Sequence, residues 1–469
     1  MGRASDIPIE PPTGAGPGIV RAVEDRSYLG YIAAALASAV LGGFVFAVWI
    51  PMAMSGATGG GDRLAYMIQA HGWIQLQGWA GLFVAGMAIR LMPRFAGRKP
   101  VPKSVTAPLL VVLVIPLVLR ITLQTWADGS MARGVAVAIG ATTAAGALGV
   151  AVVLAVTLAK GKKVREPWRY FAWAGTAWWA IWAVLALAYM PLDDPAPGVL
   201  AFRDNDALLW IVMLGPVGNF IWGVQSRSVP VFYGRGTPPL KQLILPGLLY
   251  NAGIAVLTLS LAAEGTNPTA AGLGLAGAGA ALIWMPPLAG SIRGQAKRLR
   301  PRARPAARFL IAANLSAMAA GLLLVWSGAD MLISDDPWAS LQVRDAARHL
   351  FGVGTVTMLI LGMARLVAPF FALERTESGV PMLLERLPFW LLVAAVLLRA
   401  AVPLLGDTLD YEPGRHTMAL AGALAWLAIA IFAVSVARAV RAEPRTKRAL
   451  EGVAANARAR NAPRTTGSE

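Results

Sequence analysis

The stretch from His71 to Arg98, HGWIQLQGWAGLFVAGMAIRLMPRFAGR, determines how the rest of the chain is organised. Its second part, GLFVAGMAIRLMPRFAGR, aligns without gaps with GNFIWGVQSRSVPVFYGR, which begins 137 residues later at Gly218, and eight of the eighteen positions are identical. A third copy, LILGMARLVAPFF, begins at Leu359 and keeps its glycine, its proline and its final phenylalanine in register after a further 139 residues. A repeat of this kind sets the architecture of a chain.

Composition identifies the class of protein that carries this repeat. Apolar residues make up 57% of the 469 residues and charged residues only 14%, whereas a soluble domain carries about 25% charged residues. A membrane span needs roughly 20 mostly apolar residues, and this criterion predicts twelve spans in an all-α integral membrane protein. The predicted spans are 29–54, 65–93, 105–126, 133–159, 168–191, 206–226, 241–263, 270–292, 306–328, 345–371, 387–405 and 415–440.

The three copies fall on the second, sixth and tenth predicted spans, so the repeating unit contains four helices. Units at 29–160, 166–297 and 305–440 are expected to lie in parallel around a pseudo-threefold axis, because four helices return the chain to the same side of the membrane. Glycines allow close helix packing in lipid, and we interpret the motif as scaffold. The tails, 1–28 and 441–469, are expected to be disordered or to lie on the membrane.

Basic residues are distributed unequally between the two sides of the predicted bundle. Loops after even-numbered spans are basic, as in AKGKKVREPWR, and loops after odd-numbered spans are acidic, as in MPLDDPAPG. Counted over loops, tails and span ends, Lys and Arg number 32 on the first side and 6 on the second. Because positively charged loops stay on the cytoplasmic side, the protein is expected in a bacterial inner membrane with both termini on its cytoplasmic side. The net charge of +17 then reflects topology and contact with lipid, and nucleic-acid binding is not expected.

The candidate ligands are few. There is no cysteine, which excludes disulfides, thiolate-ligated clusters and the covalent attachment of c-type haem. The three histidines, His71, His349 and His416, all lie early in even-numbered spans, towards the outer side. A neutral imidazole in an apolar span is a good iron ligand. His416 stands at the mouth of the last span, where an interfacial or supporting role is expected before that of a ligand, although it could support a second iron.

The repeat sharpens the interpretation of the other two histidines. The third-unit position equivalent to His71 is Ala347, and His349 lies two residues further on, which turns its side chain by roughly 200°. Helices 2 and 10 could therefore face each other across one cleft and supply two axial ligands to one haem. Unit two has Leu208 and Trp210 at these positions. The alternative is that both histidines are hydrogen-bonded interfacial residues.

Arginines inside the spans suggest partners for haem propionates. Arg120 in span 3 and Arg399 in span 11 lie at roughly the depth of the histidines, and Gln124 follows Arg120 by one turn. Arg348 and Arg415 each precede a histidine. A buried arginine needs an anion, carbonyl groups or water, and its planar fork suits a carboxylate. The alternative is that Arg120 and Arg399 bind backbone carbonyls at helix breaks.

With histidines on helices 2 and 10 and pseudo-threefold four-helix units, the chain resembles the catalytic subunit of the haem–copper oxidases and nitric oxide reductases. HGWIQLQGWAGLFVAGMAIRLMPRF and HLFGVGTVTMLILGMARLVAP are more similar to the NnrS family of membrane haem proteins. The resemblance implies that His71 and His349 are axial ligands of a low-spin haem b. Helix 6, LLWIVMLGPVGNFIWG, lacks the oxidase copper ligands, and Ala347 replaces the histidine of the active-site haem. No copper and no binuclear centre are therefore expected.

These features predict a membrane-bound b-type cytochrome with one haem b, or two, near the outer face. It would transfer electrons between the quinone pool and an outer-face partner, or form the haem subunit of a respiratory complex, rather than act as an oxidase or reductase. One alternative is an NnrS-like haem protein of nitric oxide stress or nitrogen-oxide metabolism. The other is a haem-free anion transporter that uses Arg120 and Arg399.

Overall fold

The computed structural model describes residues 26–59, 63–127, 129–189, 198–262, 267–289, 304–367, 382–405 and 411–461, and every regular element in these ranges is a helix. Several helices contain π-helical segments, labelled η. The elements are α2 (Ser27–Ser38), η1 (Ala39–Gly43), α3 (Phe44–Met54), α4 (Leu64–Trp73), η3 (Ile74–Gly81), α5 (Leu82–Phe95), α6 (Lys103–Leu119), η4 (Arg120–Gln124), α7 (Gly129–Ala159), α8 (Pro167–Ala188), α9 (Phe202–Val212), η5 (Met213–Gly218), α10 (Asn219–Phe232), α11 (Leu240–Ala262), α12 (Pro268–Leu288), α13 (Arg304–Ser334), α14 (Leu341–His349), η8 (Leu350–Thr357), α15 (Met358–Val367), α16 (Met382–Leu404) and α17 (Tyr411–Asn461).

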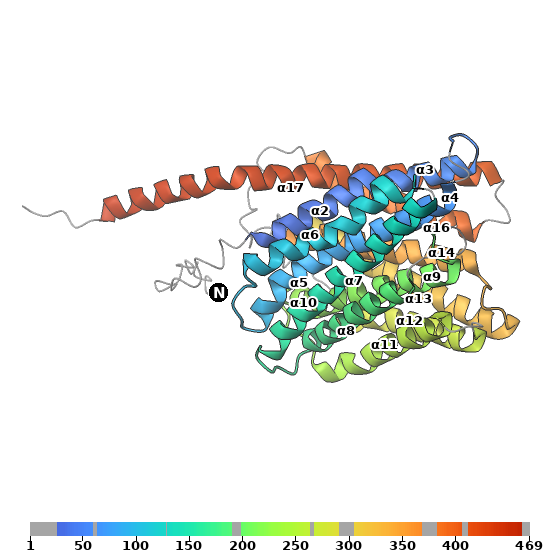
Figure 1. Cartoon of the computed structure of the whole chain (residues 1–469). Coiled ribbons are helices and arrows are strands. Elements are labelled where there is room, and N and C mark those ends of the chain that lie inside the picture. Colours follow the sequence, from blue (N-terminus) through green and yellow to red (C-terminus); the bar gives the residue numbers. More distant parts are fainter. Residues whose placement is uncertain are drawn as a thin grey trace, which may run out of the picture.

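The described helices form one elongated bundle (Figure 1). Eleven of them are long and apolar enough to cross a membrane, and large aliphatic and tryptophan side chains are exposed along their outer faces. The prediction of a helical, multi-pass membrane protein is confirmed to this extent. The remaining predicted span, 65–93, is continuously helical through α4, η3 and α5 but is not among the eleven. Polar residues, including three glutamines and His71, lower its hydropathy.

The repeat recurs in the backbone as a π-helical interruption. Segment η3 spans 74–81 and η8 spans 350–357, which is the same register after 276 residues. Segment η5 ends at Gly218, the counterpart of Gly81. A π-turn inserts one extra residue into an α-helix and is frequent at functional sites. The second helix of each unit is therefore widened at equivalent positions, and in units one and three the widened segment directly follows the turn that contains a histidine.

The repeated glycine packs each of these helices against the first helix of its own unit. A Cβ atom added to Gly86 would lie 2.5 Å from Cβ of Tyr31 on α2, and one added to Gly362 would lie 2.8 Å from Cβ of Phe309 on α13. The same addition at Gly223 would lie 3.4 Å from Cβ of Phe171 on α8. Close contact between a glycine and the base of an aromatic residue thus occurs three times, which supports the interpretation of the motif as scaffold.

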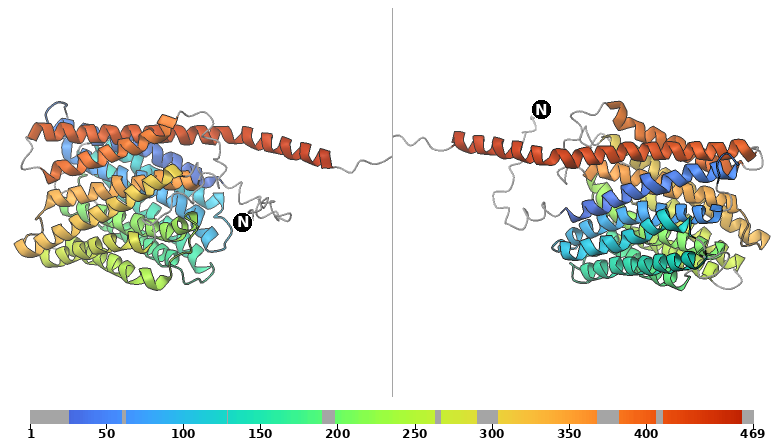
Figure 2. Two further views of the ribbon diagram at one scale, coloured as in Figure 1. Left: turned by 180° about the vertical axis from the view of Figure 1, so that it is seen from behind. Right: turned by 45° about the horizontal axis from the view of Figure 1, so that its top comes forward.

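The C-terminal tail is helical over its described part, so the expectation of disorder is wrong for residues 441–461, and the alternative, that the tail lies on the membrane, stays a prediction. Residues 441–461 were expected to be disordered or to lie on the membrane, whereas α17 continues without a break to Asn461. The helix extends straight beyond the end of the bundle at which α2 begins (Figures 1 and 2). Residues 441–461 include six alanines and five arginines, which are strong helix formers and favour the continued helix. The other tail, 1–25, and residues 462–469 lie outside the described residues.

Candidate functional site

His71 lies in the last turn of α4, and His349 is the last residue of α14, so each precedes a π-helical segment. Nδ1 of His71 lies 2.8 Å from the backbone oxygen of Gly43, in the π-helical segment of the first helix. A carbonyl oxygen can only accept a hydrogen bond, so Nδ1 must carry the proton when the ring is neutral. This contact leaves the lone pair of the neutral ring on Nε2.

His349 is held in the same way, with an added carboxylate. Its Nδ1 lies 2.8 Å from the backbone oxygen of Asp345 and 3.3 Å from Oδ1 of the same residue. The other carboxylate oxygen, Oδ2, lies 2.8 Å from Nη2 of Arg399 on α16. Arg399, Asp345 and His349 therefore form a chain of charged and polar contacts that fixes the ring, and the lone pair of neutral His349 is again on Nε2.

The two histidines are neighbours across the bundle. Segments η3 and η8 pack against each other, Nε1 of Trp79 donates a 2.9 Å hydrogen bond to Oγ1 of Thr357, and His71 lies within electrostatic range of His349. Both rings are partly exposed, and neither Nε2 has a hydrogen-bond partner among the described residues. The backbone at Gly352, one turn after His349, faces open space. The site thus presents two imidazole nitrogens without hydrogen-bond partners among the described residues.

Arg120 and Gln124, predicted to share the site of the histidines, belong to a different cluster. Arg120 donates a 2.9 Å hydrogen bond from Nη1 to Oε1 of Gln124, and its guanidinium lies 4.1 Å from the ring centre of Trp73. Trp73 follows His71 by two residues and so lies on the opposite side of α4. Arg120 lines a small cavity of about 20 Å³, and among the described residues it contacts no carboxylate. The position of Arg120 in the sequence predicted how deep it lies in its span, but it did not predict which neighbouring helix its side chain faces.

Arg348 is likewise occupied. It forms an ion pair with Asp206 on α9, its guanidinium lies 4.8 Å from the ring centre of Trp210, and Arg344 lies 3.9 Å from the same carboxylate. Asp206 is 3% exposed, so it is a buried link between α9 and α14.

Arg415 and His416, at the start of α17, differ from each other in burial. The Arg415 side chain is buried, whereas the His416 side chain is exposed. Within the described ranges, no group of three or more His, Asp or Glu side chains could hold a metal ion. The role of His416 at a second iron stays a prediction.

The interface that contains the histidine pair differs from the other two interfaces between units. Trp73, Trp210 and His349 occupy one repeat position, at successive offsets of 137 and 139 residues. The interface between units one and two is filled by Trp73 beneath Arg120, and that between units two and three by Trp210 beneath Arg348. At the interface between units three and one, the same position is a histidine. Among the described residues, this third interface alone presents ligand atoms in place of a tryptophan covered by an arginine.

Asp345 is the residue of the site that the sequence did not single out. It precedes His349 by four residues, a spacing that places two side chains on one face of a helix. It is also the repeat equivalent of Asp206 and of Gln69, whose side chain bonds the backbone of Leu200. A polar residue at this position in all three units was the available signal. Each one forms a contact between elements, and the one in unit three orients a histidine.

No model of a known protein family matches the chain, and no curated protein is significantly similar to it. The fold and the site define an all-helical, multi-pass membrane protein with a pair of oriented histidines between its first and third helical units.

Proposed function

We propose that the protein is a membrane-bound b-type cytochrome in which His71 and His349 are the two axial ligands of one haem b. The observation that carries this proposal is the hydrogen bonding of the four ring nitrogens of His71 and His349. Each Nδ1 is bonded to a carbonyl oxygen, and each Nε2 is without a partner among the described residues. Histidines that bind metals characteristically donate the other ring N–H to a carbonyl or carboxylate, which fixes the tautomer and the ring orientation.

Haem b bound through two axial imidazoles would supply reversible transfer of a single electron. The chain's own contribution is to orient the rings and to set the charge around them. The Asp345 carboxylate lies beside His349 and increases the basicity of that ring, whereas His71 is bonded to an uncharged carbonyl. The two ligands are therefore unequal, and changes to Asp345 should alter the redox potential without removing a ligand.

Arg399 is the best placed of the predicted arginines for a propionate. It is one contact away from His349, through Asp345, and its Nη1 is buried without a hydrogen-bond partner. Arg348 is paired with Asp206 and Arg120 faces Trp73, so neither is presented to the histidines in the same way. Asp345 neutralises one side of the guanidinium of Arg399 and leaves the other side for a second carboxylate.

The proposed partners follow from the predicted topology. If both termini lie on the cytoplasmic side of a bacterial inner membrane, as the distribution of basic residues predicts, the histidines lie towards the outer face. The haem would then transfer electrons between the quinone pool and an outer-face redox partner, or within a larger respiratory complex. An NnrS-like role in nitric oxide metabolism would require an axial position to open, and addition of nitric oxide to the purified protein distinguishes this role by a change in the haem spectrum.

One observation favours a second candidate, anion transport. Arg120 is 4% exposed, lines a small cavity and contacts no carboxylate among the described residues, so it could bind a small anion. The second arginine of that hypothesis, Arg399, is paired with Asp345. Anion-dependent flux in liposomes that contain haem-free protein, and loss of that flux in Arg120→Met, would support this candidate.

Absorption spectroscopy of the purified protein tests the cytochrome proposal. We expect a sharp α-band on reduction with dithionite and one haem b per chain by pyridine extraction. His71→Ala and His349→Ala should each abolish the low-spin spectrum. His416→Ala is the matched control, because it removes the third histidine from an exposed position and should leave the spectrum unchanged. A colourless wild-type protein, or equal effects of all three substitutions, would refute the proposal.

A further inference from the structure

A large apolar cavity lies in the opposite half of the bundle from the histidines. Its volume is about 600 Å³, and its walls come from α2, α5, α10, α15 and α17. Phe83, its first residue on α5, follows His71 by twelve residues, which corresponds to about 18 Å along a helix. The cavity is therefore separate from the candidate haem site.

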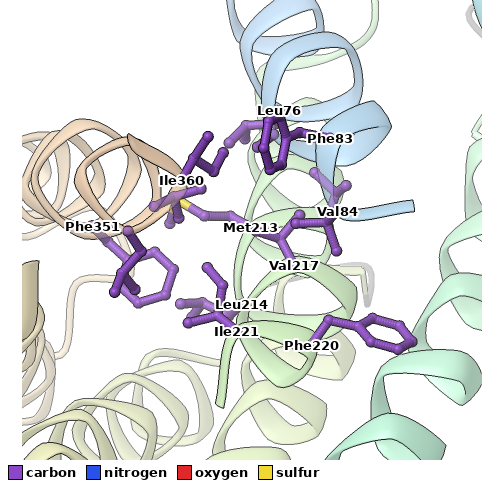
Figure 3. Close-up of a cluster of buried hydrophobic side chains, with 14 of the residues drawn as sticks. Leu76, Phe83, Val84, Met213, Leu214, Val217, Phe220, Ile221, Phe351 and Ile360 are labelled. Carbon is purple, nitrogen blue, oxygen red and sulfur yellow. The ribbon is translucent and has the colours of Figure 1, made fainter. Parts of the chain in front are cut away.

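Equivalent positions of the three repeat units form the walls of the cavity. Four positions of the motif, two adjacent pairs separated by two residues, each contribute one lining residue from every unit. Figure 3 labels five of these residues, which come from three helices. The equivalent sets are Phe83, Phe220 and Leu359; Val84, Ile221 and Ile360; Met87, Val224 and Met363; and Ala88, Gln225 and Ala364. The cavity thus lies where the three units meet, on the pseudo-threefold axis, and eleven of these twelve side chains are apolar.

The twelfth, Gln225, breaks the pattern. It is 2% exposed, and its Oε1 accepts a 3.1 Å hydrogen bond from Nδ2 of Asn314. The same Nδ2 donates to the backbone oxygen of Leu310 at 2.7 Å, which fixes the orientation of both amides. Nε2 of Gln225 is left buried without a partner. A buried amide donor without an acceptor is destabilising, so this group identifies where a ligand oxygen would bind.

The remaining polar side chains of the lining do not favour a charged ligand. Arg227 is paired with Glu166, and among the described lining residues only Gln225 has a buried polar atom without a partner. The occupant should therefore be neutral and largely apolar, with a hydrogen-bond acceptor. Phe83, on one of the walls (Figure 3), could stack on a planar ring.

We propose that this cavity binds the ring of an isoprenoid quinone, with one ring carbonyl accepting a hydrogen bond from Nε2 of Gln225. The apolar walls contributed by the three units surround the ring and the start of its tail. Binding does not depend on the haem; only the assignment of this quinone as the electron partner rests on the proposed function.

Equilibrium dialysis of decylubiquinone against the full-length protein in detergent tests the site. Gln225→Leu should weaken binding about tenfold, the effect of losing one hydrogen bond in a buried site. Ala88→Leu, at the equivalent position in unit one, should weaken binding further because it fills the cavity. Gln242→Leu, remote on α11, is the matched control and should bind as wild type. Haem absorbance and circular dichroism of each variant report whether it is folded.

Two results would overturn the proposal. One is binding that is equally strong in wild type and in folded Gln225→Leu and Ala88→Leu, and the other is displacement of the quinone by phosphatidylglycerol at equal concentration, which would assign the cavity to lipid. The haem and quinone proposals fail separately. A colourless protein whose quinone binding depends on Gln225 would retain this site, and a cytochrome that binds no quinone would lose only this site.

Discussion

Substitution of the repeated motif glycines by alanine should have opposite effects on stability at two equivalent positions. In a helix, alanine is favoured over glycine by up to about 1 kcal/mol, and insertion of a methyl group into a tightly packed site costs about 1–3 kcal/mol. Which effect dominates depends on the space beside each glycine. That space differs between Gly86 and Gly223.

At Gly86 the new methyl group would lie 2.5 Å from Cβ of Tyr31. Tyr31 cannot easily move, because its ring is 1% exposed and its hydroxyl donates a 2.7 Å hydrogen bond to the backbone oxygen of Thr106. Gly86→Ala should therefore destabilise the protein by about 1–2 kcal/mol net. At Gly223 the nearest atoms, the backbone oxygen of Trp168 and Cβ of Phe171, lie 3.3 and 3.4 Å away. Gly223→Ala should be neutral or stabilising by up to about 1 kcal/mol.

Thermal unfolding in detergent, followed by tryptophan fluorescence at one scan rate, measures the order of the variants. The apparent Tm should fall for Gly86→Ala, fall less for Gly362→Ala, whose methyl group would lie 2.8 Å from Cβ of Phe309, and hold or rise for Gly223→Ala. Gly134→Ala on α7 is the control for helix propensity alone, since no atom lies within 4 Å of its added methyl group. A Tm of Gly86→Ala equal to or above that of Gly223→Ala would refute the packing argument.

Two further predictions concern the charged residues near the site. Asp345→Asn should keep the haem, because the backbone oxygen at 2.8 Å still orients His349. It should raise the midpoint potential by on the order of 50 mV, because loss of a nearby negative charge disfavours the oxidised iron. Potentiometric titration beside Asp204→Asn, a partly exposed control paired with Arg203, measures this shift, and an unchanged potential would contradict it. Arg399→Met should lower haem content per chain, whereas Arg120→Met should leave it unchanged and keep or raise the Tm, since a well-packed apolar replacement of a buried charge is often neutral or stabilising. Equal losses of haem in the two variants would show that Arg120 also serves the haem site.

The features of the fold that the sequence predicted are those that hydropathy and the repeat can report. Runs of apolar residues gave the spans, and the alignment from Gly81 anticipated packing at Gly86, Gly223 and Gly362. The π-helical segments were not predicted, because a π-turn leaves no distinct pattern of residue types. The helical continuation of α17 to Asn461 was missed because polarity and arginine content suggested disorder.

For the candidate site, the sequence could give depth but not direction. Arg120 and Arg399 were treated as equivalents on the basis of their depth in spans 3 and 11, yet one lies over Trp73 and the other pairs with Asp345. A residue placed one turn or half a turn differently faces another helix, and a π-helical segment between the aligned glycines and the histidines shifts this phase further. Such contacts depend on the rotation of each residue about its helix axis, which depth in a span does not specify.

The locations of the two candidate sites follow from a common principle of the triplicated chain. Where the three units share a residue type, as at the motif glycines, the residue packs helices together. Where one unit departs from the other two, the departure creates a polar group that the scaffold does not itself need. His349 stands where the other units have Trp73 and Trp210, and Gln225 stands between two alanines. An interior built from three similar units can tolerate such a group only if something satisfies it. Asp206, at a position that is polar in all three units, has its partners within the chain, in Arg348 and Arg344. For Nε2 of Gln225, which is buried, and for Nε2 of His349, on a partly exposed ring, the described residues provide none. These two unpartnered nitrogens are where we expect a bound carbonyl compound and a bound cofactor.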